Sequence, residues 1–431
     1  MFKILRKVPL LTLGFLLWFA MPAAAETTVS AEVGFIFNTF LFLVCGFLVM
    51  FMAAGFAMLE AGSVTSKSVS VICAKNIGLF SIAGIMFWMF GYNLAYGIPE
   101  GGYIGSFIPW SDSSAVDTGY SDGSDWYFQM VFCATTVSIV SGTLAERIKL
   151  WPFFLFAAIL SGIIYPIVMG WQWGGGWLAS AGFSDFAGST LVHSVGGWAA
   201  LVTIYFLGAR IGKYSADGTS NPIFGHNMPL AAGGVLILWL GWFGFNGGSV
   251  LSADPATTSL VLVTTSLAAA SGGIVASVFS HILYKNYDLT MFMNGVLGGL
   301  VAITAGADQM STGEAMIIGG IGGIIVVLAI ALLEKLKLDD PVGAIAVHLF
   351  AGMWGTLAVG IFGNMASTKQ FMLQLAGIGI AGAFCVLSAL ILVLIVKVTI
   401  GLRVTKEHEI GGLDDAEHGM SAYADFSVSK K

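Results

Sequence analysis

The chain has 431 residues, of which 57% are hydrophobic and only 10% are charged. A typical soluble domain has about 25% charged residues, so this composition excludes a soluble enzyme, a disordered protein and a nucleic-acid-binding protein. The net charge of −6 gives no sign of a nucleic-acid partner either. Glycine is abundant, with 57 residues, which favours closely packed transmembrane helices. The sequence therefore predicts an all-α polytopic membrane protein.

The first 25 residues have the organisation of a secretory signal peptide. Three basic residues precede an apolar stretch over 8–21, and three alanines over 23–25 form a small-residue end. We expect cleavage after Ala25, which would leave the new N-terminus outside the cell; an uncleaved first helix is the alternative. Residues 26–400 would then form the membrane domain, and residues 401–431 a polar cytoplasmic tail.

Eleven apolar segments follow the predicted signal peptide, each long enough to cross about 30 Å of hydrocarbon. They cover 33–59, 70–97, 126–145, 150–170, 189–209, 227–247, 256–283, 289–306, 315–333, 341–363 and 371–399. An odd number of spans and an outside N-terminus place the C-terminus in the cytoplasm. After the signal segment, Lys and Arg lie in or beside the predicted cytoplasmic segments, with Lys369 as the exception. This bias agrees with the positive-inside rule for a multi-pass protein of the cell membrane.

The fifth and tenth segments begin with the same Asp-x7-His pattern. His193 follows Asp185, and His348 follows Asp340, while the two segments are predicted to run in opposite directions. Two five-helix halves of inverted topology would produce this repeat. Eight helical residues span about 12 Å, so both histidines would lie at mid-membrane depth and close together.

Intramembrane histidines are functional candidates by default. A pair of hydrogen bonds that bridges helices is the structural alternative. Two histidines without a third ligand fall short of a zinc site, so we expect no metal and no cofactor. No nucleophile–base arrangement or phosphate loop indicates an enzyme. We expect Glu146 and Arg147 to form a structural ion pair at the cytoplasmic end of the third span.

Long motifs throughout the chain resemble the Amt branch of the Amt/Mep/Rh family of ammonium transporters. They are Ala54–Gly62, Asp185–His193 with the Ser-Val-Gly-Gly that follows, Gly241–Ser249, Asp339–His348 and the tail stretch Gly412–Tyr423. The resemblance covers nearly the whole chain after the signal segment. It implies a homotrimer with one pore through each subunit, and it suggests that a trimeric PII-type regulator binds the cytoplasmic face.

The resemblance also implies a role for each pore residue. The substrate-binding residues would be Trp173, Ser249, Phe132 and Asp185; the gate residues would be Phe132 and Phe245; and the twin-histidine pore would be His193 and His348. Asp185 also precedes a helix, so it is a candidate for capping backbone amides there. Methylammonium should be accepted as a slower analogue because it keeps the charge and several N–H donors.

These residue types suit the chemistry of ammonium. Aromatic faces attract a cation by about 0.5–2 kcal/mol, and a serine hydroxyl can accept a directed hydrogen bond from it. An apolar pore beyond the gate opposes a full charge, whereas two neutral histidines can relay a proton. We therefore predict selective ammonium uptake in which ammonium is deprotonated, ammonia passes the histidines, and the proton moves with it electrogenically.

Three alternatives remain open at the level of sequence. A passive channel for neutral ammonia needs no proton transfer. An ammonium sensor would keep the fold and signal instead; only about 30 residues follow the last span, which disfavours a built-in output domain. A channel for another neutral gas, as proposed for Rhesus relatives, is disfavoured by the presence of Trp173 and Ser249.

Overall fold

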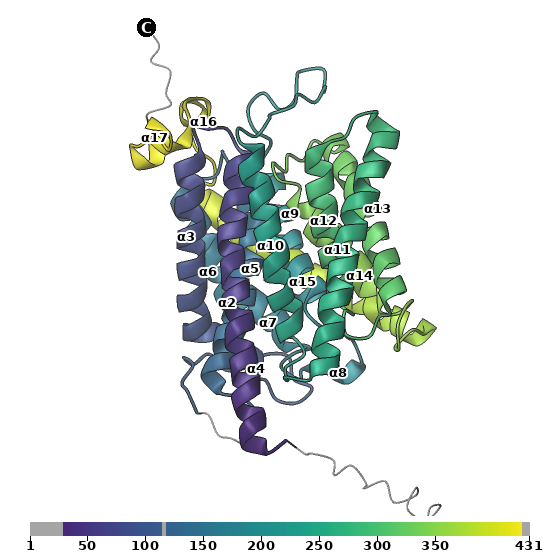
Figure 1. Ribbon diagram of the computed structural model, residues 1–431. Helices are drawn as coiled ribbons and strands as arrows, with labels where there is room; N and C mark the ends of the chain where they lie inside the picture. Colours follow the sequence, from purple (N-terminus) through teal and green to yellow (C-terminus); the bar gives the residue numbers. More distant parts are fainter. Residues whose placement is uncertain (1–28, 114–117, 425–431) are drawn as a thin grey trace, which may run out of the picture.

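The computed structural model describes residues 29–113 and 118–424, and the signal peptide predicted over 1–25 lies outside them. Within these ranges the chain is helical, and the only β-type pairing consists of two isolated bridges, Ile148 with Arg403 and Tyr214 with Ser220. The long helices stand side by side in one bundle (Figure 1). The predicted all-α class is therefore confirmed.

Each predicted apolar range overlaps a helical segment. The helices are α2 (Ala31–Ser63), α3 (Val69–Met86), α4 (Tyr92–Tyr96), α5 (Asp122–Thr143), α6 (Leu150–Ile159), α7 (Tyr165–Gly170), α8 (Trp177–Ala181), α9 (Val195–Leu207), α10 (Met228–Gly248), α11 (Pro255–Tyr284), α12 (Leu289–Ile303), α13 (Thr312–Lys335), α14 (Ala351–Ala358), α15 (Thr368–Thr399), α16 (Lys406–Gly411) and α17 (Leu413–His418). Four π-helical segments continue some of them: η1 (Phe87–Gly91), η3 (Leu160–Ile164), η4 (Ser189–Ser194) and η5 (Ile345–Phe350).

Eight helical segments among the described residues are long and apolar enough to cross a membrane. The continuous segments α12 and η5–α14 are apolar but shorter. Helix α5 is not among these apolar segments and contains several Ser and Thr residues, but nearly all of its residues are buried in the bundle. So many apolar helices, closely associated, make the chain a multi-pass membrane protein; the full count of eleven spans stays a prediction.

The bundle has two ends, which we name by the segments that lie there. The tail face carries α16, α17 and the loop over 208–227, and the loop face at the opposite end carries α8 and the loop over 97–113 (Figure 1). The polar tail docks on the first of these: Asp414 accepts hydrogen bonds from the amides of Val69 and Val71, both at 3.0 Å. Its carboxylate thereby caps the start of α3.

Glycine permits the closest helix contacts, as its abundance predicts. At the crossing of α2 and α10, a Cβ on Gly234 would lie 2.5 Å from the Leu59 amide nitrogen and 2.6 Å from the Gly55 carbonyl oxygen. A Cβ on Gly299 would collide with the Ala268 carbonyl oxygen where α11 meets α12. Backbone therefore packs directly on backbone at these crossings, which is the usual mode of association for helices in membranes.

Candidate functional site

The residues predicted to form the gate are stacked deep in the bundle. Phe132 of α5 and Phe245 of α10 lie nearly parallel, with ring centroids 3.8 Å apart and planes inclined by 16°. Both side chains are buried, at 1% and 0% exposure. Two stacked rings without solvent access form an apolar plug, since a hydrated ion cannot pass between them unless they move.

Trp173 and Ser249 lie on the loop-face side of this plug. The half-buried Trp173 ring meets Phe132 edge-on at 6.0 Å, and its indole N–H donates to the Asp185 carbonyl at 2.8 Å. The Ser249 hydroxyl donates to the Phe245 carbonyl at 2.9 Å. Because its only hydrogen is used in that bond, the oxygen presents its lone pairs as acceptors. The structure thus brings an aromatic wall and a hydroxyl acceptor next to the plug.

Asp185 caps the start of η4. Its carboxylate is buried at 0% exposure and accepts four backbone hydrogen bonds of 2.7–2.9 Å, from the amides of Gly188, Ser189, Thr190 and Leu191. The capping role considered from the sequence is therefore confirmed. Since its carbonyl also holds the indole of Trp173, this residue connects the aromatic wall to the histidine-bearing segment.

Asp340 builds the same local structure before η5. Its carboxylate accepts hydrogen bonds from the amides of Val342, Gly343 and Ile345 at 3.3, 3.0 and 2.8 Å. In both segments a glycine three residues after the aspartate has a positive φ, 110° at Gly188 and 78° at Gly343. Asp-x-x-Gly occurs in the sequence at both places, so this short repeat is the signal from which both caps could have been predicted.

The two histidines meet at the centre of the bundle. His193 in η4 and His348 in η5 are 0% and 3% exposed, and their Nδ1 atoms are 3.2 Å apart. One Nδ1 must donate and the other accept, so of the two Nε2 atoms one carries a hydrogen and one offers a lone pair. A proton that enters at one Nε2 can therefore leave at the other after one exchange within the pair.

His193 lies directly behind the stacked rings. Its imidazole is 5.3 Å from the Phe245 ring and stacks on Trp242 at 4.9 Å. The Trp242 indole is fixed by a 2.8 Å hydrogen bond to the Thr304 hydroxyl. Among the described residues, Nε2 of His193 has no hydrogen-bond partner. Leaving a buried nitrogen unpaired costs about 1–3 kcal/mol, so this atom is a candidate for binding a small molecule or a proton.

Two cavities continue from the histidines towards the tail face. The first is small, about 10 Å³, and His348, Phe56 and Glu60 are part of its lining. The second is about 550 Å³ and more open, and it includes Ser63, Arg210 and Glu334 in its wall. Leu59, Asn294 and Val342 line both cavities, so the two cavities are neighbours.

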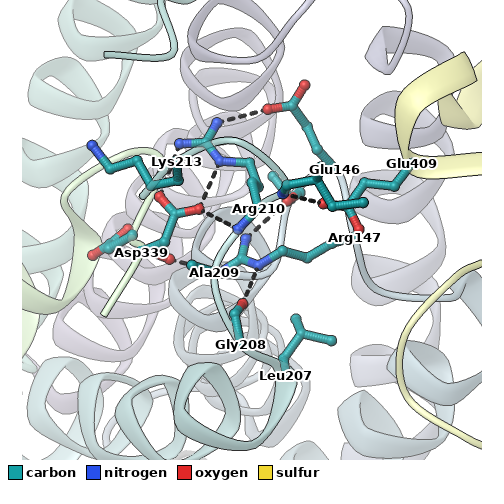
Figure 2. A network of polar contacts seen from close by, with 12 residues as sticks. Glu146, Arg147, Leu207, Gly208, Ala209, Arg210, Lys213, Asp339 and Glu409 are labelled. Carbon is teal, nitrogen blue, oxygen red and sulfur yellow. Dashed lines mark hydrogen bonds and ion pairs between the residues drawn. The ribbon is translucent and has the colours of Figure 1, made fainter. Parts of the chain in front are cut away.

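A polar network on the tail face (Figure 2) contributes Arg210, Lys213 and Asp339 to the wall of the larger cavity. Arg210 donates to Asp339 through Nε at 2.8 Å and Nη2 at 3.0 Å, and to Glu146 through Nη1 at 2.7 Å. All three side chains are buried. Burial raises the pKa of Asp339, but the hydrogen bonds and charge of Arg210 outweigh it and hold that pKa below its usual value.

The predicted Glu146–Arg147 ion pair is wrong. Glu146 has φ 68°, and this turn directs it to Arg210 and to the hydroxyl and amide of Thr65. Arg147 donates instead to the backbone carbonyls of Gly208, Ala145 and Asp339 at 2.8, 3.0 and 2.6 Å. Burial lowers the pKa of Arg147 to about 10, so it stays protonated and ties three segments of the tail face together.

The chain is similar to known ammonium transporters. The family model described as Ammonium Transporter Family matches residues 40–423. The chain is 40% identical to the ammonium transporter Amt2 of Archaeoglobus fulgidus over 411 residues, covering 89% of this chain and 87% of the relative. It is 39% identical to the ammonium transporter Amt2 of Methanocaldococcus jannaschii over 400 residues, covering 91% and 92%.

Solved structures with the same fold include a protein titled Sensor Amt Protein. That structure has a TM-score of 0.87 and 36% identity, and the match covers 90% of this chain and 100% of the other. Mep2 of Saccharomyces cerevisiae has a TM-score of 0.79 and 26% identity, with 89% and 92% covered.

Proposed function

The chain belongs to the Ammonium Transporter Family, and from this premise we propose that it takes up ammonium selectively by the route that its buried column of side chains outlines. Ammonium is recruited on the loop-face side of the plug. There Trp173 and Phe132 offer aromatic faces, and Ser249 accepts a hydrogen bond. Asp185 adds a negative field from behind without touching the ion.

Deprotonation occurs as the substrate passes the Phe132–Phe245 gate. Moving a full positive charge into the apolar column costs several kcal/mol, whereas neutral ammonia avoids much of that cost and potassium cannot. His193 Nε2 receives the proton, and exchange across the 3.2 Å Nδ1–Nδ1 contact passes it to His348. Net charge thus crosses the membrane although the nitrogen crosses as neutral ammonia.

The observation that carries this proposal is the unpaired Nε2 of His193. It is a buried nitrogen, without a partner in the described part of the chain, placed immediately behind two stacked rings. The position of this nitrogen supports its role as a site where ammonia or a proton binds transiently.

The test is a current measurement on a solid-supported membrane that carries the purified protein. An ammonium jump should give a transient current, methylammonium a smaller one, and potassium none. Ammonia flux detected by internal pH without any current would instead support the passive neutral channel. Neither current nor flux, with ammonium binding retained, would support the sensor.

The sensor remains a second candidate because of one specific likeness. The structural neighbour titled Sensor Amt Protein shares 36% identity with this chain. Binding without flux is the outcome that would favour this candidate over transport.

The membrane arrangement proposed with this function follows the charge bias. Eleven spans, arranged as two five-helix halves of inverted topology plus α15, would place the N-terminus outside and the tail face in the cytoplasm. The twin Asp-x-x-Gly caps before η4 and η5 support the repeat.

A signal peptide cleaved after Ala25, a homotrimer and a PII-type regulator on the cytoplasmic face complete the proposal. Crosslinking in native membranes and co-purification under nitrogen-replete conditions test the last two.

A further inference from the structure

Glu60 is a buried carboxylate that the route described above does not use. It lies near the tail-face end of α2 and is 1% exposed. Its Oε2 accepts a hydrogen bond from the Ser141 hydroxyl at 2.8 Å and lies 3.5 Å from the ammonium of Lys75. Its Oε1 accepts no hydrogen bond of normal geometry within residues 29–113 and 118–424, since the neighbouring Asn76 amide donates to the Ile72 carbonyl at 3.0 Å. Leaving a carboxylate oxygen buried and unpaired is costly, so this atom needs an explanation.

The unpaired oxygen belongs to a side chain that lines the small cavity beside His348. That cavity also includes Phe56, Asn294 and Val342 in its lining, and its volume of about 10 Å³ is close to what one water molecule needs. Asn294 and Val342 line the larger tail-face cavity as well. The small cavity therefore lies between the histidine pair and the wide cavity at the tail face, and Glu60 is part of its wall.

Lys75 makes this carboxylate suitable for holding a proton only briefly. The ammonium is 2% exposed, donates to the Ser141 carbonyl at 2.6 Å and lies 5.4 Å from the Phe153 ring centroid. If Glu60 became protonated, the charge of Lys75 would be left without its counter-ion in a buried site. An uncompensated buried charge is strongly unfavourable, so a proton on Glu60 would soon move on.

We propose that Glu60 is the proton acceptor that follows the twin histidines, an inference that rests on the proposed electrogenic uptake. Ammonium gives ammonia and one proton. The proton enters at His193 Nε2, leaves from His348 Nε2 to a water molecule in the small cavity, and passes from that water to Oε1 of Glu60. The resulting carboxylic acid releases it to water of the larger cavity, so no proton is gained or lost over the cycle.

The experiment measures current and ¹⁵N-ammonium uptake in the same proteoliposomes. The main variant is the double substitution Glu60→Gln with Lys75→Met, which removes both charges together and leaves neither one buried alone. The matched control is Glu334→Gln, because Glu334 lines the larger cavity but not the small one and pairs with Lys213 at a partly exposed position. We expect the charge moved per nitrogen to fall about tenfold or more in the double variant, while ¹⁵N uptake continues and the control behaves like the wild type.

A second variant covers the case in which the double variant does not fold. Glu60→Asp keeps the negative charge near Lys75 but withdraws the carboxylate by one methylene, and it should lower the current more than the ¹⁵N uptake. An unchanged charge-to-nitrogen ratio, or a parallel loss of current and uptake, would overturn the role of Glu60. A wild-type protein that takes up ammonia without current would refute the electrogenic function itself, and the relay with it; a wild-type current with unaltered variants would refute only the relay.

Discussion

Two parts of the molecule treat buried polar groups in opposite ways. On the tail face, Arg210 donates hydrogen bonds of 2.7–3.0 Å to Asp339 and Glu146. Arg147 donates hydrogen bonds to three backbone carbonyls. In the central column, the described chain offers no partner to Nε2 of His193. The contrast separates two kinds of buried group: the charged side chains of the tail-face network pair with one another, whereas the histidine that we propose handles the substrate keeps one nitrogen free.

The largest expected effect is a loss of stability when the hydrogen-bonded network around Arg210 is broken. Arg210→Ala would leave Asp339 and Glu146 as buried carboxylates without their counter-ion, and this should destabilise the protein by about 3–5 kcal/mol. Thermal unfolding in detergent, followed by intrinsic fluorescence, measures the loss. The control is Lys213→Ala, whose pair with Glu334 is partly exposed and should be worth about 1 kcal/mol or less. Similar losses in the two variants would contradict the distinction.

The twin histidines in the central column should show the opposite behaviour, with a large effect on transport and a small one on stability. Replacing both histidines by leucine, His193→Leu with His348→Leu, should lower the ammonium current about 100-fold but change the unfolding temperature little. Replacing both partners of a buried hydrogen bond by apolar groups of similar size is nearly neutral for stability. Current and thermal stability are measured on the same preparation. A large loss of stability with only a modest loss of current would show that the histidine pair serves mainly as a helix bridge.

Much of this contrast was accessible from the sequence, and the missing part has a physical cause. The spans, the Asp-x7-His repeat and the stacking of Phe132 with Phe245 were predicted from local pattern and family resemblance. The partner of Glu146 was not, because a left-handed turn directs that side chain to a loop 64 residues away. Glu60 was visible only as a letter in a motif, since its importance depends on a cavity formed by several distant segments.

A smaller effect on stability is expected when either capping aspartate of the repeat, Asp185 or Asp340, is replaced. Asp185→Asn and Asp340→Asn each remove a charge and turn an N–H donor towards backbone amides, so each should cost about 1–2 kcal/mol. Asp185 accepts four backbone hydrogen bonds and Asp340 accepts three, so the two losses of stability should be similar, with the larger one for Asp185→Asn. Only Asp185→Asn should also weaken ammonium recruitment, because it removes a negative charge next to Trp173; the backbone carbonyl that holds the indole is unchanged. Equal effects of the two substitutions on transport would contradict the recruitment role of Asp185.

The smallest expected effect is a dependence of folding stability on pH that arises from Asp339 on the tail face. Because Arg210 holds the pKa of Asp339 below its usual value despite burial, the folded protein binds this proton less readily than the unfolded chain does. The stabilising contribution is therefore complete above the unfolded pKa of about 3.9 and is lost as the pH falls through the lower folded value. A tenfold difference in proton affinity between the folded and unfolded chains would correspond to about 1.4 kcal/mol of stability.

Unfolding temperatures recorded from neutral pH into this acid range should fall for the wild type and fall less steeply for Asp339→Asn. That variant should start from a lower stability at neutral pH, because the charge-assisted pair with Arg210 is already gone. Equal acid slopes for the two proteins would mean that other carboxylates set the acid limit. The network around Arg210 would then be stabilised by its geometry rather than by the ionised state of Asp339.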